Sequence, residues 1–273
     1  MTGTALAAGA VVSAAALSGC SLDVDGAKHH EERSYTVTGA VTTIDLKSDN
    51  GSVEVVGSDS PGVKVVERLT WSSERRKPKP EHVTEGNTLK LRSRCDGNVI
   101  GFSSCGLSYR IQVPRGMALN LHNDDGAVNV AGLRGTVRVT TDTGRITVDD
   151  VKTTSLFAKT SDGMIKVSGQ ATTAELTTDT GAIGSAGLQA DRLVARTQDG
   201  AIRIRLTTPP ATVDARTDTG AVELSVPSTQ PYAISLSTDT GGRHIDPTLR
   251  NESHAQRKIK ASTQDGTIRI RPA

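Results

Sequence analysis

Apolar and polar residues alternate along most of the chain, and the alternation continues through a recurring glycine. Around Gly144, apolar residues lie seven and five positions before the glycine, at Val137 and Val139, and two and four positions after it, at Ile146 and Val148. Alternation with a period of two is typical of a half-buried β-strand. Each unit is therefore predicted to be a strand, a tight turn and a second strand.

The glycine-centred unit recurs with a nearly constant period. Between Gly126 and Gly220, successive glycines are 18, 19, 18, 19 and 20 residues apart. Such a period is the signature of a solenoid, in which stacked units bury one continuous core. We therefore predict an all-β fold, a right-handed parallel β-solenoid with repeats of about 19 residues. The predicted structural turns lie at Gly51, Gly126, Gly144, Gly163, Gly181, Gly200, Gly220, Gly241 and Gly266.

An antiparallel β meander or sandwich is the alternative fold, because Asp-Gly between two strands is also a hairpin signal. The constant period favours the solenoid. We expect regular repeats over residues 118–273 and an irregular N-terminal β region over 35–117. An insertion at 71–87 interrupts that region, because Pro78 and Pro80 lack the amide donor that a sheet ladder needs. The unit around Gly241 departs from the apolar rule and is expected to contain a bulge and a longer loop.

Small polar residues precede each turn glycine. The residue three positions before it is Ser, Asn or Thr, and its side chain is predicted to point inward and bond the turn backbone. Aspartate lies one or two positions before the glycine, and this offset alternates, which separates the carboxylates of stacked turns. Asp218 and Asp239 break the alternation, so a stacked pair is expected there. The aspartates are interpreted as turn caps, with Asp218 and Asp239 as weak calcium candidates.

The first residues are predicted to target the chain for export. Residues 1–19 carry no charged side chain, are too short and weakly apolar for a secure membrane span, and are interpreted as a signal peptide. The end of this segment, Leu17-Ser18-Gly19-Cys20, resembles the bacterial lipobox, which implies cleavage before Cys20 and a diacylglycerol on that cysteine. No Lys or Arg precedes the apolar run, which departs from the usual pattern. Residues 20–34 are predicted to form a flexible tether to the membrane.

Cys95 and Cys105 are predicted to form a disulfide. They lie ten residues apart, and an exported chain of three cysteines with one lipidated has two left to pair. The alternative, a thiolate metal site, lacks a Cys-x-x-Cys spacing and further ligands. The formal net charge of +2 and the absence of a basic patch interleaved with aromatic residues give no support for nucleic-acid binding. No cofactor is predicted.

The ordered motifs resemble the DUF4097 family of adhesin-like bacterial proteins with β-strand repeats. The resemblance is carried by Val113-Pro114-Arg115-Gly116, followed by Leu119-Asn120-Leu121 and Gly126-Ala127-Val128, and it covers about residues 36–271. It implies a β-solenoid exposed on the cell surface. The family supplies no catalytic residues that can be transferred to this chain.

Two enzymatic interpretations compete with a binding function. Asp-Thr-Gly occurs at 142–144, 179–181, 218–220 and 239–241, as in aspartic proteases, but four copies at the repeat spacing indicate turns. A polysaccharide-active enzyme of the β-helix type is the alternative function, with outward Arg203, Arg205, Arg269 and Arg271 as its basic groups. We predict instead a non-enzymatic, lipid-anchored protein on the outer side of the cell membrane. Its partner is expected to be a surface polymer or a protein.

Overall fold

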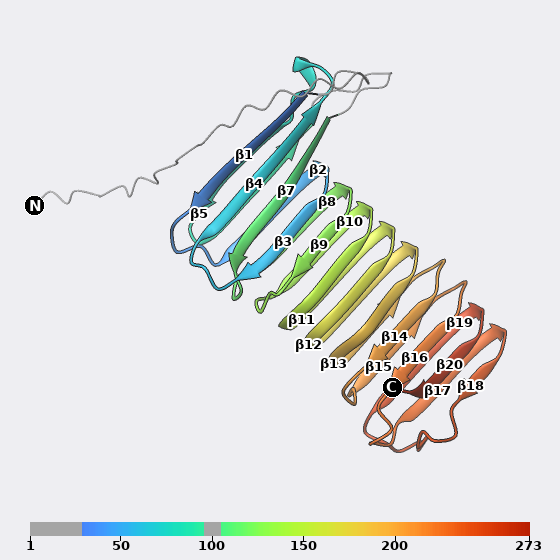
Figure 1. Ribbon diagram of the computed structural model, residues 1–273. Helices are drawn as coiled ribbons and strands as arrows, with labels where there is room; N and C mark the ends of the chain where they lie inside the picture. Colours follow the sequence, from blue (N-terminus) through green and yellow to red (C-terminus); the bar gives the residue numbers. More distant parts are fainter. Residues whose placement is uncertain (1–28, 96–104) are drawn as a thin grey trace, which may run out of the picture.

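The computed structural model describes residues 29–95 and 105–273, which contain twenty β-strands and one short 3₁₀ helix. They form one elongated body with β1 at one end and β18 at the other (Figure 1). The helix, η1, spans Glu74–Arg76. The strands are β1 (His29–Val37), β2 (Thr43–Asn50), β3 (Val53–Ser58), β4 (Val63–Trp71), β5 (Lys79–Glu85), β6 (Thr88–Arg94), β7 (Cys105–Pro114), β8 (Ala118–Asp125), β9 (Val128–Ala131), β10 (Val137–Thr143), β11 (Ile146–Asp162), β12 (Ile165–Thr180), β13 (Ile183–Arg196), β14 (Ile202–Leu206), β15 (Thr212–Arg216), β16 (Val222–Val226), β17 (Ala233–Thr240), β18 (Arg243–Ile245), β19 (Lys258–Asp265) and β20 (Ile268–Pro272).

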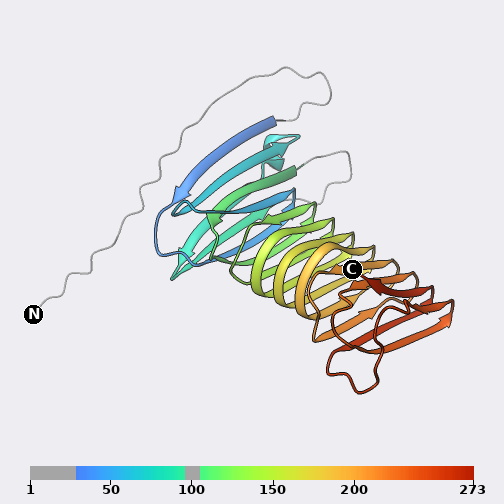
Figure 2. The ribbon, with the colours of Figure 1, turned by 60° about the horizontal axis from the view of Figure 1, so that its bottom comes forward.

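Two parallel ladders face each other across the core. The first ladder runs β6, β2, β8, β10, β11, β12, β13, β15, β19, β17. The second runs β7, β3, β9, β11, β12, β13, β14, β16, β20, β18. The long strands β11, β12 and β13 belong to both, so the sheet winds around the core as a coil (Figure 2). We call one turn of this coil, with a strand segment from each ladder, a rung. The parallel β-solenoid is confirmed, and its right hand stays a prediction.

Inward side chains stack on equivalent side chains of the next rung. Ile146 is in register with Ile165, and Ile165 with Ile183, and all three are fully buried. Because neighbouring strands lie about 4.8 Å apart, branched aliphatic side chains pack directly on one another along the coil. This geometry explains why Val, Ile, Leu and Ala fill the core of a chain that contains few aromatic residues.

The end of the solenoid at β1 and β5 is antiparallel. β1 pairs with β4, β4 pairs with β7 and β5 pairs with β6. Residues 29–34 belong to β1, so the tether predicted to extend to residue 34 is wrong at that end. Its charged side chains are compatible with a strand because β1 lies at the sheet edge. Pro80 lies in β5, another edge strand, where no ladder donor is needed on the outer side.

The order of rungs in space differs from their order in the sequence at both ends. β19 lies between β15 and β17, and β20 lies between β16 and β18. The last unit of the chain is therefore inserted between two earlier ones. At the other end, β2 and β3 lie between the rung of β6 and β7 and the rung of β8 and β9.

The rung of β17 and β18 ends the solenoid, which explains the irregular unit around Gly241. Arg243 is in register with the buried Ile268 but is itself exposed, because no strand from residues 29–95 or 105–273 covers the outer side of β18. An inward-pointing charge on an edge strand opposes pairing with another chain. Residues 246–257 form the longer connection to β19.

The predicted signal peptide, Cys20 and residues 20–28 of the predicted tether lie outside the described residues. Within 29–95 and 105–273, no helix is long and apolar enough to cross a membrane.

Candidate functional site

The turn glycines form a column in which each turn packs closely on the turn of the next rung. All nine predicted positions have positive φ, from 125° at Gly51 to 158° at Gly163 and Gly200. A Cβ atom on Gly163 would collide with the carbonyl oxygen of Gly144, and one on Gly181 with that of Gly163. Glycine is therefore required by the backbone conformation and by the close approach of neighbouring turns.

The threonines before the turns connect adjacent rungs. Thr197 Oγ1 donates to the Gly181 carbonyl at 3.0 Å, and Thr217 Oγ1 donates to the Gly200 carbonyl at 2.9 Å. Both threonine side chains are buried. The same bond recurs along the column, because each hydroxyl satisfies a carbonyl that the tight turn leaves without a ladder partner. The Asp-Thr-Gly motifs are thus parts of a repeated turn.

The prediction that Asp218 and Asp239 lie in line on neighbouring rungs is wrong. Thr219 and Thr240 are both in register with Asp265, so Gln264 lies between the two aspartates. The physical reason is the inserted rung of β19 and β20. In space the residues two positions before the glycine alternate without a break from β10 onward: Asp142, Ser161, Asp179, Gln198, Asp218, Gln264 and Asp239. Among the described residues, no cluster of three His, Cys, Asp or Glu side chains is placed to hold a metal ion.

A disulfide joins Cys95, just after β6, to Cys105, the first residue of β7. It lies at the corner where the inner rungs carry their glycine turns. The Cys95 amide donates to Asp49 Oδ2 on the neighbouring rung at 3.1 Å. The bond therefore joins the end of β6 to the start of β7 at this corner.

A buried polar cluster lies in the antiparallel end of the solenoid. Tyr35 Oη donates to Glu67 Oε1 at 2.9 Å, and the His82 ring stacks on Tyr35 with centroids 4.3 Å apart. Burial raises the pKa of Glu67, although the bond from Tyr35 and the charges of His82 and Arg33 oppose the shift. Burial also raises the pKa of Tyr35, with a further contribution from Glu67.

This cluster was not predicted from the sequence. The signal was an inward position in the alternation of β4, where a carboxylate replaces an aliphatic residue at Glu67. Tyr35 and Glu67 bond to each other and are buried, and the exposed His82 ring stacks on Tyr35, so the cluster is interpreted as part of the end structure.

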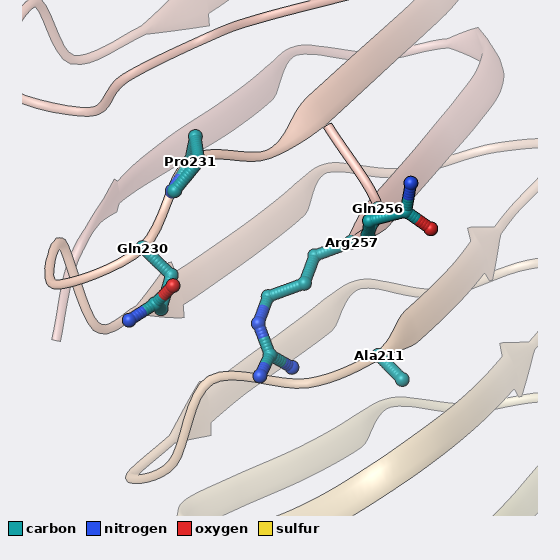
Figure 3. A pocket seen from close by; sticks show the side chains of 5 residues that line it. All are labelled: Ala211, Gln230, Pro231, Gln256 and Arg257. Carbon is teal, nitrogen blue, oxygen red and sulfur yellow. The ribbon is translucent and has the colours of Figure 1, made fainter. Parts of the chain in front are cut away.

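A pocket of about 430 Å³ lies among the connections of the C-terminal rungs, where Ala211, Gln230, Pro231, Gln256 and Arg257 line it (Figure 3). The Arg257 guanidinium donates to the carbonyls of Pro209 and Pro210 at 2.8 and 3.0 Å. This arginine therefore ties two connections together. The side chains that line the pocket include one cation and no carboxylate. Such a lining suits a structural contact or a small polar ligand.

The outward side chains of β14, β16 and β20 form a basic surface. Arg203 and Arg205 lie on β14, Arg269 and Arg271 on β20, and Glu223 on β16 between them. All four arginines are exposed. They were predicted to point outward, and the structure brings them together across one intervening strand. Guanidinium groups in such an array can bind carboxylate, sulfate or phosphate groups.

Comparisons with known proteins agree with this architecture. The family model described as Toastrack DUF4097 matches residues 41–271. A solved structure of a putative adhesin from Bacteroides fragilis NCTC 9343 aligns with a TM-score of 0.56 and 16% identity, over 92% of this chain and 100% of its own. One from Parabacteroides merdae ATCC 43184 gives 0.55 and 11%, over 88% and 95%. One from Parabacteroides distasonis ATCC 8503 gives 0.52 and 14%, over 90% and 98%.

These structural likenesses show a shared fold. No curated protein matches the sequence. The family match covers most of the chain and confirms the resemblance found in its motifs: the chain belongs to the Toastrack DUF4097 family.

Proposed function

We propose that this protein is a lipid-anchored, non-enzymatic module on the outer side of the cell membrane, which binds a polymer or a protein in the manner of an adhesin or scaffold. The observation that carries the proposal is the solenoid itself. It is long (Figure 1) and stiffened by two continuous ladders, and its strands present regularly spaced, outward side chains. Such a surface suits an extended partner better than a small substrate.

Three further observations support a cell-surface role. The solved structures that share the fold are called putative adhesins. The lipobox-like segment that ends at Cys20 provides a membrane anchor, with the residues that follow it as the link to the solenoid. The disulfide between Cys95 and Cys105 agrees with an oxidising, extracytoplasmic location.

A non-enzymatic function is favoured over a polysaccharide-active enzyme. An enzyme that hydrolyses glycosidic bonds typically needs two carboxyl groups that flank the scissile bond. The pocket in Figure 3 supplies only Arg257. The four outward arginines lie on a flat sheet, and the one carboxylate on the same three strands, Glu223, lies among them as a neighbour in the ladder.

The anchor is tested by metabolic labelling with an alkyne analogue of palmitate in a bacterial host that processes lipoproteins. We expect label on the wild-type protein and none on Cys20→Ala, because the thiol of Cys20 is the attachment atom. The double variant Cys95→Ala/Cys105→Ala is the control and should keep its label. Equal labelling of wild type and Cys20→Ala would remove the anchor from the proposal.

A further inference from the structure

We propose that the outward face of β14, β16 and β20 is the binding surface of this protein, and that it takes a linear anionic polymer such as an acidic polysaccharide. We call Arg203, Arg205, Arg269 and Arg271 the arginine grid. This inference rests on the proposed function and names the partner of the binding module. Its experiment uses purified protein and does not depend on the lipid anchor.

The arginine grid has a geometry fixed by the sheet. Arg203 and Arg205 are two residues apart on one strand, so their Cα atoms are separated by about 7 Å. Glu223 is in register with Arg203 on one side and Arg269 on the other, which places the two arginines two strands apart, at about 10 Å. The grid is therefore a rectangle of four cations on a continuous β-sheet. Its cations recur along the solenoid axis, as anionic groups recur along a charged polymer.

The positive charge of the grid is mostly uncompensated. Glu223 is the single carboxylate on these three strands, and its Oε2 lies 3.9 Å from Arg203 Nε. No ion pair is found for Arg205 or Arg269 within the described part of the chain. Asp246, whose amide donates to the Ile270 carbonyl, is a carboxylate on the neighbouring rung, and its Oδ1 accepts bonds from the amide and hydroxyl of Thr248.

The opposite ladder of the same solenoid carries cations too, including Lys258 and Lys260 on β19, but two of its arginines are paired with carboxylates. There Arg196 pairs with Asp214 at 3.0 Å and Arg216 pairs with Asp218 at 3.4 Å. The formal charge of the whole chain is only +2, whereas β14, β16 and β20 together carry four arginines and one glutamate. A local surplus attracts a polyanion to one face of the solenoid.

The middle strand holds the grid in place. Ser225 is nearly buried between Arg205 and Arg271, and its Oγ accepts a bond from Arg271 Nε at 3.1 Å. This bond uses one donor of the guanidinium and leaves its terminal nitrogens for a ligand. A guanidinium that is already oriented loses less entropy when it binds a carboxylate or sulfate.

The partner is a polymer and not a membrane or a nucleic acid. The large apolar side chains exposed in the described residues are Val83 and Met164, and neither lies on β14, β16 or β20. The face therefore offers nothing to insert between lipid tails. The outward positions of these three strands also carry no aromatic ring on which bases could stack. Charge and spacing are the features that remain, and both suit an anionic chain lying along the sheet.

The test is the affinity of the protein for fluorescent dextran sulfate, measured by fluorescence anisotropy at several salt concentrations. We expect wild-type protein to bind, with an affinity that falls as salt rises. Arg205→Gln/Arg269→Gln should weaken binding about tenfold at low salt, because it removes two grid cations. Arg196→Gln/Arg216→Gln makes the same change in net charge on the opposite ladder and should alter binding less than about twofold. Glu223→Gln should strengthen binding.

Absence of binding by wild-type protein, or equal losses in the two arginine variants, would overturn the arginine grid as the site. Neutral dextran must not compete, and vesicles of anionic phosphatidylglycerol and single-stranded DNA must bind more weakly than dextran sulfate. Stronger binding to vesicles or DNA would overturn the assignment of the partner. Unchanged thermal midpoints of the variants show that they fold. If wild-type protein binds dextran sulfate but carries no label that depends on Cys20, only the anchor is contradicted. If the label depends on Cys20 but dextran sulfate does not bind, only the arginine grid is contradicted.

Discussion

At the scale of single residues, the turn glycines carry two separate constraints. Gly163 has a φ of 158°, and a Cβ on it would collide with the Gly144 carbonyl oxygen of the neighbouring rung. We predict that Gly163→Ala lowers the free energy of unfolding by at least about 2 kcal/mol, because the backbone strain and the collision both act in the folded state. Chemical denaturation with a two-state fit measures the change.

Gly116→Ala is the matched control for the turn substitution. Gly116 has no positive φ, and a Cβ added there would meet nothing within 4 Å. Its substitution should change the free energy of unfolding by less than about 0.5 kcal/mol. Equal effects at the two positions would show that the rungs do not approach each other at the turns as described.

The buried carboxyl of Glu67 gives a second prediction at this scale. Burial raises its folded pKa above the ordinary value of 4.5, so above that pH the folded chain keeps a proton that the unfolded chain releases. The stability from this group is therefore fully present below pH 4.5 and is lost as pH rises toward the raised pKa. Glu67→Gln cannot ionise, and its amide oxygen still accepts from Tyr35. When thermal midpoints are measured from pH 4 to 8, the midpoint of Glu67→Gln should rise relative to that of wild type as pH rises. A difference in midpoint that does not change with pH would contradict this.

At the scale of elements, the sequence predicts inner strands well and edge strands poorly. An inner strand has a neighbour on both sides and one face in the core, which enforces the alternation seen in β10 or β19. β1, β5 and β18 lie at edges, where one side faces solvent and charge prevents unwanted pairing. The charged residues of these three strands, and Pro80 in β5, are tolerated because of their position at the sheet edge. The local pattern of residues alone could therefore not identify β1, β5 and β18 as strands.

The candidate surface was predictable only in part for a related reason. Alternation correctly placed Arg203 and Arg205 outward on β14, and Arg269 and Arg271 outward on β20. Which strands lie side by side depends on contacts between residues far apart in the sequence, and the period near 19 residues does not specify them. The buried position of Glu67 was visible in the alternation of β4, but its partner Tyr35 lies on a strand that the sequence did not reveal.

At the scale of the whole molecule, the order of the rungs connects the sequence to the proposed function. In simple sequence order β18 would follow β16, and the outward His244 would lie beside Glu223. The structure places β20 there instead, which brings Arg269 and Arg271 into the arginine grid. The offsets of the turn aspartates agree with this order, because the inserted Gln264 separates Asp218 from Asp239. Repulsion between stacked carboxylates thus favours the observed arrangement.

The position of β20 beside β16 is tested most directly by disulfide trapping between outward positions. Glu223 is in register with Arg269, and Arg269 is in register with His244. Adjacent Cα atoms at about 4.8 Å permit a disulfide, whereas positions two strands apart, at about 10 Å, do not. After mild oxidation and peptide mapping, Glu223→Cys/Arg269→Cys should be cross-linked and Glu223→Cys/His244→Cys should keep two free thiols. A cross-link in the second pair and none in the first would contradict the order of the rungs and the arginine grid built on it.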